Sequence, residues 1–212
     1  MKSIFSALLL LPGFLLSGPG AISQSKFALS ATVAPYYGHI KSRVEAMLPD
    51  PNGSGAITSQ VLRSEISPKG YWAGLNGRYS FSQKWSVSTG FWFNHSSTSK
   101  SGTKSRSHHF SIPVIANLQI TERKLSPYLS AGALWNFGTT SRLTIPDLGT
   151  VTFKSDRNTS RISSLIGAGV IYHFAERLSL VAQPTFTYAI PPSNINIHAY
   201  QLSLNVQLML KL

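Results

Sequence analysis

The chain has 212 residues, a formal net charge of +12 and no cysteine. This length corresponds to one domain, and the lack of cysteine excludes disulfides, thiolate metal sites and lipid attachment through cysteine. In a soluble protein so high a charge would suggest nucleic-acid binding, but the N-terminus and the strand pattern of this chain point to a membrane and exclude that partner.

The N-terminal residues have the composition of a secretory signal. Met1 to Ser3 supply a short positive region, and residues 4–16 are mostly apolar with one Pro-Gly interruption. This run is too short for a spanning helix, and Ala21-Ile22-Ser23 is similar to a signal peptidase site. We therefore predict a cleaved signal peptide at residues 1–23 and an outer-membrane β-barrel domain at residues 24–212.

About eight later segments alternate apolar and polar residues with a period of two, which predicts β-strands. Tight turns alternate with longer hydrophilic connections, as in outer-membrane barrels whose two termini lie on the periplasmic side. The predicted strands are 26–38, 70–82, 84–96, 107–120, 126–139, 160–174, 177–189 and 199–212. The longer connections, predicted as loops, are 39–69, 97–106, 140–159 and 190–198.

The composition of the two faces decides which one points outward. The polar face carries hydroxyls, amides and glycines with almost no charge, which suits a narrow interior better than a solvated surface. The apolar face has aromatic residues near both ends, where the two bilayer interfaces would fall. We predict an all-β fold, an eight-stranded antiparallel up-and-down transmembrane β-barrel, in preference to a lipocalin-like soluble barrel of opposite polarity.

Two tryptophans and two cations fall on the inward face of this pattern. Trp72 and Trp92 should obstruct a lumen that is already narrow, so we expect no passage of solutes. Arg78 and Lys211 lie near periplasmic ends, where we expect both to reach water or a turn carboxylate such as Glu122.

Three prolines interrupt the predicted strands. Pro35, Pro113 and Pro184 cannot donate a backbone hydrogen bond to a neighbouring strand. We expect a β-bulge at each, with a local change in which side chains face inward.

Short motifs in the later strands resemble those of a known family. They are Ser111-Ile112-Pro113, residues 126–133, Gly167-Ala168-Gly169-Val170 and Arg177-Leu178-Ser179-Leu180. On these residues the mature chain resembles the small outer-membrane protein β-barrel domain family, the group of OmpX-type and OmpA-type barrels. The resemblance implies the outer membrane of a Gram-negative bacterium. The last strand is similar to the signal read by the outer-membrane assembly machinery, although it ends in Leu212 where Phe or Trp is usual.

Charge gives the main indication of a ligand. Much of the basic excess lies in the predicted outer loops, where the nearest dense anions are the phosphates and carboxylates of lipopolysaccharide. Solvated loops kept basic for solubility are the alternative. The possible lipopolysaccharide contacts are Lys100, Lys104, Arg106, Arg142, Lys154, Arg157 and Arg161.

A catalytic alternative depends on two residues. His109-x-Ser111 has the spacing of the His-x-Ser pair in lipid A deacylases of the PagL type, but Ile112 follows where that family has Asn. No acid nearby could orient the histidine, as a catalytic dyad requires. We therefore predict no enzyme activity, no catalytic or metal-binding residues and no cofactor.

We expect a monomeric, non-porin barrel with a structural, adhesive or envelope-interaction role, whose partners are outer-membrane lipids, lipopolysaccharide and the assembly machinery. A lipid A-modifying hydrolase and an accessory barrel of a secretion system, similar to PorT, remain the alternatives.

Overall fold

The structure, a computed structural model, describes residues 26–49, 57–100, 103–145, 149–154, 160–191 and 196–212. The predicted signal peptide lies outside these residues. No helix among the described residues is long and apolar enough to cross a membrane.

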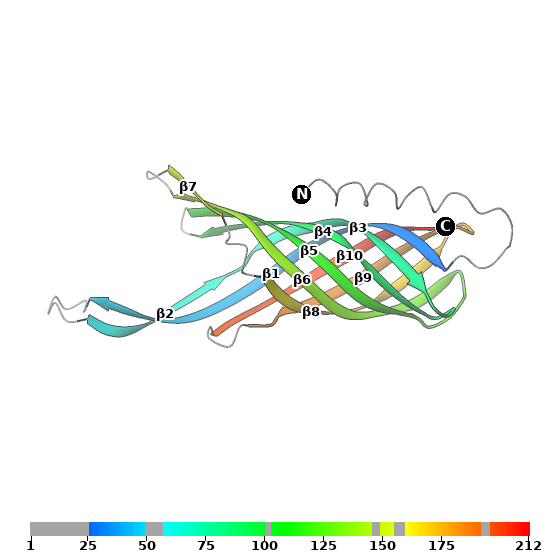
Figure 1. Ribbon diagram of the computed structural model, residues 1–212, viewed down its shortest axis with the longest axis horizontal. Helices are drawn as coiled ribbons and strands as arrows, with labels where there is room; N and C mark the ends of the chain where they lie inside the picture. Colours follow the sequence, from blue (N-terminus) through cyan, green and yellow to red (C-terminus); the bar gives the residue numbers. More distant parts are fainter. Residues whose placement is uncertain (1–25, 50–56, 101–102, 146–148, 155–159, 192–195) are drawn as a thin grey trace, which may run out of the picture.

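The described chain forms one antiparallel sheet of ten strands that closes on itself, because the last strand pairs with the first (Figure 1). The strands are β1 (Phe27–Pro49), β2 (Ile57–Ile66), β3 (Lys69–Ser80), β4 (Trp85–Lys100), β5 (Thr103–Gln119), β6 (Leu125–Ile145), β7 (Gly149–Lys154), β8 (Ser160–His173), β9 (Leu178–Ala189) and β10 (Asn196–Lys211). All except β2 and β7 form the wall, in the order β1-β3-β4-β5-β6-β8-β9-β10. The predicted eight-stranded barrel is confirmed.

β2 and β7 belong to hairpins that extend past the wall at one end of the barrel (Figure 1). β1 continues through Pro49 and pairs with β2, and the end of β6 pairs with β7. β4 and β5 also stay paired as far as Lys100 and Thr103. The prediction of loops at 39–69, 97–106 and 140–159 is therefore wrong over much of their length. Backbone pairing does not depend on hydrophobicity, and Ser, Thr and Val continue a ladder that the wall has already started.

Tight turns connect the strands at the opposite end. In the β3–β4 turn the Ser82 backbone nitrogen donates to the Trp85 carbonyl, and in the β8–β9 turn Ala175 donates to Leu178, both at 3.3 Å. The Leu212 nitrogen donates to the Phe27 carbonyl at 3.0 Å, so the chain's last residue lies beside the start of β1. The short turns, the start of β1 and the end of β10 thus share one end, as predicted.

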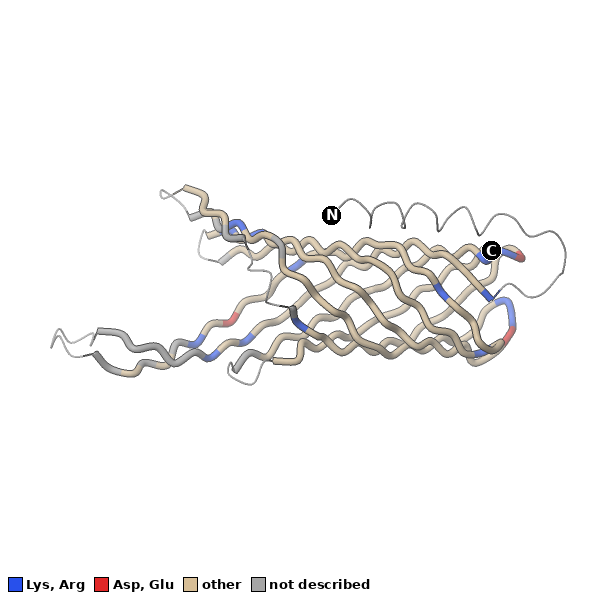
Figure 2. The backbone as a smooth tube through the Cα atoms, in the orientation of Figure 1, with Lys and Arg blue, Asp and Glu red and all other residues tan. Residues whose placement is uncertain are grey.

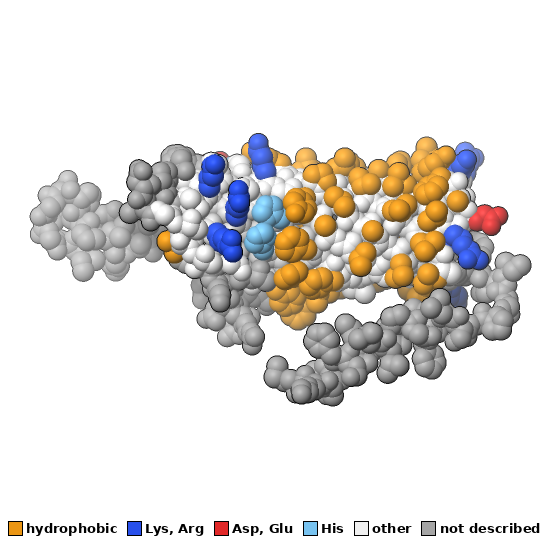
Figure 3. Space-filling view, turned by 90° about the horizontal axis from the view of Figure 1, so that it is seen from above, with side chains coloured by type: hydrophobic (Ala, Val, Ile, Leu, Met, Phe, Trp, Pro, Cys, Tyr) orange, Lys and Arg blue, Asp and Glu red, His pale blue; other side chains and the backbone are white. Residues whose placement is uncertain are grey.

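The outer surface of the wall is apolar. Every second residue of β10 from Tyr200 to Leu210 is exposed, although all are hydrophobic. A space-filling view shows the resulting hydrophobic band around the barrel, with charged side chains beyond its edges (Figure 3). Most lysines and arginines likewise gather near the two ends (Figure 2). An exposed apolar band of this extent indicates contact with lipid.

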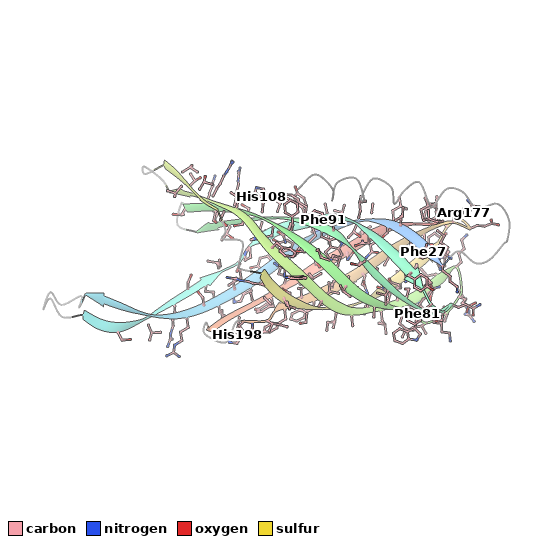
Figure 4. The ribbon with its side chains drawn as sticks, in the orientation of Figure 1. Phe27, Phe81, Phe91, His108, Arg177 and His198 are labelled. Atoms are coloured by element: carbon pink, nitrogen blue, oxygen red, sulfur yellow. The ribbon has the colours of Figure 1, made fainter. Side chains whose placement is uncertain are left out.

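Aromatic side chains mark both edges of this band. Phe27, Phe81 and Arg177 lie near the end with the short turns, whereas His108 lies toward the opposite end (Figure 4). The Phe27 and Tyr79 rings pack 5.0 Å apart between centroids. The aromatic residues predicted for the outer edge, called here the outer aromatic girdle, are all exposed or half-buried: Tyr37, Tyr71, Phe93, Phe110, Trp135, Phe137, Tyr188 and Tyr200.

The inside of the barrel contains two apolar clusters separated by polar side chains. The cluster nearer the hairpins contains Ala34, Tyr36, Trp72, Trp92, Ile115, Leu134 and Leu165. The other contains Ala28, Tyr128, Ile171, Val181 and Met209. Between them buried amides and hydroxyls bond to one another: Asn76 donates to Thr32 Oγ1 at 2.7 Å and accepts from Trp92 Nε1 at 2.6 Å. The inward placement of Trp72 and Trp92 is therefore confirmed.

Arg78 corrects one expectation. Its side chain is 8% exposed and lies inside the barrel instead of reaching water or Glu122. Arg78 Nε donates to Ser86 Oγ at 2.7 Å, and the guanidinium carbon lies 5.2 Å from the centroid of the Tyr128 ring. An aromatic face provides partial compensation for a buried cation, so a carboxylate is not required here. Lys211, by contrast, is exposed.

The prolines do not produce the predicted bulges. Pro35, Pro113 and Pro184 each keep a residue partner on one neighbouring strand, and pairing on the other side is interrupted without a change of register. Within the described strands the register shift falls instead between His108 and His109. A missing N–H removes one hydrogen bond but need not insert a residue. The inward and outward faces therefore continue unchanged past each proline.

Candidate functional site

The seven basic residues predicted to contact lipopolysaccharide do not share one surface. Lys104 and Arg106 on β5 and Arg142 on β6 are exposed near the outer end. Arg161 lies in the first turnless residues of β8, on its inward face. The side chains of Lys100 and Lys154, and all of Arg157, lie outside the described residues.

β5 carries an outward-facing row in which the chemistry changes with each step away from the hydrophobic band. Phe110 belongs to the outer aromatic girdle, and His108, Arg106 and Lys104 follow at two-residue intervals. Figure 3 shows the same order on the surface, with histidine between the hydrophobic band and the lysine and arginine side chains. Alternate residues of a strand point to the same side, so the row presents aromatic, imidazole and cationic groups in succession.

Arg106 lies directly opposite Arg142 of the neighbouring strand β6. Both side chains are exposed, and neither forms an ion pair within the part of the chain that the structure describes. Like charges directly opposite each other destabilise a sheet. An anion bound between the two guanidinium groups would remove that cost, because arginine binds phosphate and carboxylate oxygens in a bidentate way.

Two histidines separate this arginine pair from the girdle. His95 on β4 is the strand partner of His108, and their Nδ1 atoms are 3.3 Å apart. The His108 ring stacks on Phe93 with 5.6 Å between centroids, and His95 packs on Tyr71 at 5.5 Å. The rings fix the level of the arginine pair just beyond the hydrophobic band. We call Lys104, Arg106, Arg142, His95 and His108 the rim cluster.

A second like-charged pair lies on the β1–β2 hairpin. Arg43 is the strand partner of Arg63, and both are exposed. The adjacent pair along this hairpin is of opposite charge, since Lys41 Nζ lies 3.8 Å from Glu65 Oε1. Arg43 is also six residues beyond Tyr37 of the girdle, farther out than Arg106 is from Phe110. The rim cluster is therefore the cationic surface closer to the hydrophobic band and without a carboxylate partner.

Inside the outer end of the barrel is a cavity of about 380 Å³. Trp72 and Asn94 line it on one side and Ala189 and Ala199 on another. Arg161 and His109 also line it, so the structure places Arg161 in the lumen and apart from the rim cluster. Among the described residues no group of three or more His, Cys, Asp or Glu could hold a metal ion.

His109 and Ser111, the residues of the catalytic alternative, both face the lumen. Ser111 is fully buried, and its hydroxyl donates to Asn136 Oδ1 at 2.6 Å. Asn136 in turn donates to Ser163 Oγ at 2.9 Å. The serine is thus engaged by an amide within the wall, and it faces away from the lipid side from which an acyl chain would approach.

Comparison with known proteins accounts for the fold. The model of the family described as Outer membrane protein beta-barrel domain matches residues 22–193. The chain belongs to this family. It matches none of the curated proteins in sequence. Membership of the family places the protein in the bacterial outer membrane, with the hydrophobic band as its lipid-facing surface.

Solved structures show the same fold. Neisserial surface protein A (NspA) is similar with a TM-score of 0.54 and 17% identity over 89% of this chain and 98% of that one. Ail of Yersinia pestis, solved with the heparin analogue sucrose octasulfate, has a TM-score of 0.41 and 16% identity over 86% and 98% of the two chains. The outer membrane protease OmpT of Escherichia coli has a TM-score of 0.47 and 7% identity over 92% and 99%.

Strand register explains what sequence reasoning missed. The basic residues Arg106 and Arg142 were recognisable individually, but their position opposite each other depends on how β5 and β6 pair. The lumenal cavity was also missed, because it arises from small residues on β9 and β10 facing larger ones across the barrel.

Proposed function

We propose that this protein is a non-porin, envelope-interaction barrel that binds the anionic head groups of lipopolysaccharide at the rim cluster. The observation that carries the proposal is the pairing of Arg106 with Arg142 on the lipid-facing side, beyond the outer aromatic girdle. Two unpaired guanidinium groups at this level match the phosphates of lipid A in charge and geometry. A structural or adhesive role would be served by the same contact.

The interior supports the non-porin part of the proposal. An eight-stranded barrel is narrow enough for side chains to fill. Here two apolar clusters, one around Trp72 and Trp92 and one around Tyr128 and Met209, occupy successive levels of the lumen. The environment of Ser111, which donates its hydroxyl proton to Asn136, favours this role over that of a lipid A hydrolase.

The proposal is tested by the affinity of the purified barrel, in a neutral detergent, for lipid A and for dephosphorylated lipid A. The double variant Arg106→Ser and Arg142→Ser should bind lipid A roughly 30-fold more weakly, because each surface cation contributes about 1 kcal/mol near an anionic lipid surface. Dephosphorylated lipid A should bind the wild type and this variant equally.

A charge-matched control removes two cations from the other end of the barrel. Arg123 and Arg177 are exposed in the short turns, so the double variant Arg123→Ser and Arg177→Ser has the same net charge. It should bind lipid A as the wild type does. Equal losses in both double variants would show that binding follows net charge alone, and the rim cluster would not be the site.

A further inference from the structure

The lumenal cavity at the outer end exists because small side chains replace large ones at one level of the barrel. Ala199 of β10 and Ala189 of β9 are strand partners that face inward and line the cavity. In the order of wall strands, β10 is across the barrel from β5 and β9 is across from β4. The two alanines therefore leave space opposite His109 and Asn94, in a lumen that is filled elsewhere.

The cavity is closed below. Trp72, 6% exposed, lines it and belongs to the apolar cluster that fills the next level of the lumen. The Trp72 and Trp92 rings meet edge to face with 5.9 Å between centroids. The cavity is thus a cup and not a channel, so a ligand would enter and leave from the outer side. Its volume of about 380 Å³ falls in the range of small-molecule sites.

The polar groups of the cup are held in fixed positions. Asn94 is buried, and its Oδ1 accepts a hydrogen bond from the Tyr36 hydroxyl at 3.0 Å. Asn136 is held between Ser111 and Ser163 by bonds of 2.6 and 2.9 Å. Groups that are already ordered lose little conformational entropy when a ligand binds. Amides and hydroxyls arranged above an aromatic side chain suit a ligand that carries several hydroxyl groups.

The charge of the cup is of one sign. Arg161 at its mouth is a permanent cation, and His109 lines the cup beside it. No Asp or Glu occurs among the described residues that line the cavity. A guanidinium group facing hydroxyl-binding amides selects a ligand with a carboxylate or phosphate group.

We propose that this cup binds a small sugar acid from the outer side, with its carboxylate or phosphate on Arg161 and its hydroxyl groups on the amides and hydroxyls above Trp72. The site is separate from the rim cluster, because Arg161 faces the lumen and Arg106 and Arg142 face outward. Either proposal can fail without the other.

The test is a calorimetric titration of the purified, folded barrel with glucuronate, glucose 6-phosphate and neutral glucose. We expect both anionic sugars to bind and glucose to bind at least tenfold more weakly, as expected for the loss of a hydrogen bond to a charged group. Arg161→Gln should weaken glucuronate binding by a similar factor. Arg177→Gln, which removes a cation from the opposite end, should leave it unchanged.

A second variant tests the cavity itself. Ala199→Phe should fill the space between β10 and β5 and abolish binding, whereas Ala168→Phe, on the lipid-facing side of β8, should not affect it. Heat-modifiable migration on a gel verifies that each variant is folded. Failure of both anionic sugars to bind, equal binding of glucose, or wild-type binding by Ala199→Phe would each overturn the proposal.

Discussion

The guanidinium group of Arg78 lies against the ring of Tyr128, 5.2 Å from its centroid, in the lower part of the barrel interior. One terminal nitrogen of Arg78 is also 3.2 Å from Met209 Sδ, in the same apolar cluster as Tyr128. A buried charge is costly unless it is paired or hydrogen-bonded. The ring of Tyr128 and the hydroxyl of Ser86 therefore hold a cation for which the sequence suggested solvent or Glu122.

Replacing Tyr128 with leucine should expose this dependence. Tyr128→Leu removes the aromatic face and should lower the free energy of unfolding by about 2–3 kcal/mol, from the lost cation–π contact and the cavity left behind. Tyr128→Phe keeps the ring and should cost less than half as much. Urea unfolding in lipid vesicles measures both, and adding Arg78→Met to each variant isolates the coupling. Equal stability of the Leu and Phe variants would contradict the role of the ring.

The filled lumen predicts the absence of ion conduction. Two apolar clusters occupy different levels, so opening one would leave the other closed. Planar-bilayer recordings of the pure protein should show no stable unitary conductance. The double variant Trp72→Ala and Trp92→Ala should also remain closed, because Tyr128, Ile171 and Val181 still fill the lower level. Reproducible current steps from the wild type would show that the lumen is hydrated throughout.

The lipid-facing side of β10 gives a prediction about assembly. Val206 is 37% exposed on the outward face near the middle of the strand, while its neighbour Asn205 is 3% exposed and faces inward. An arginine at the bilayer midplane costs ~2–4 kcal/mol. Val206→Arg should strongly reduce the amount of folded barrel in the outer membrane, measured by heat-modifiable migration.

Asn205→Ala is the inward control for this variant. Asn205 Oδ1 has no hydrogen-bond partner among the described residues, so truncating the side chain forfeits little. Its folded level should remain near that of the wild type. If both variants assembled equally well, the strand would not face lipid as described.

The hydroxyl of Ser111 supplies a chemical test. Its bond to Asn136 is structural in this geometry, so Ser111→Ala should lower the free energy of unfolding by about 1 kcal/mol. The mass spectrum of lipid A from cells that express the variant should be unchanged. A variant-dependent change in acyl chains would instead assign Ser111 a catalytic role.

The strand pattern of the sequence was sufficient to predict the wall and the direction of its faces. Lipid selects apolar residues at every second position of β10, and this constraint is visible without a partner strand. The hairpins were missed because Ser- and Lys-rich segments such as 97–106 carry no such constraint, although their backbones pair. The arginine pair, the burial of Arg78 and the cup all depend on contacts between different strands, which no single segment encodes.

The β1–β2 hairpin separates stability from surface chemistry. Its residues are paired from Ile40↔Ile66 to Pro49↔Ile57 through backbone groups that any residue except proline supplies in full. Side chains in this part of the molecule touch neither the lipid-facing band nor the filled lumen of the wall. Substitutions there should accumulate with little loss of folding, so the hairpin could change its surface rapidly under selection by antibodies or bacteriophages while the wall sequence remains constrained.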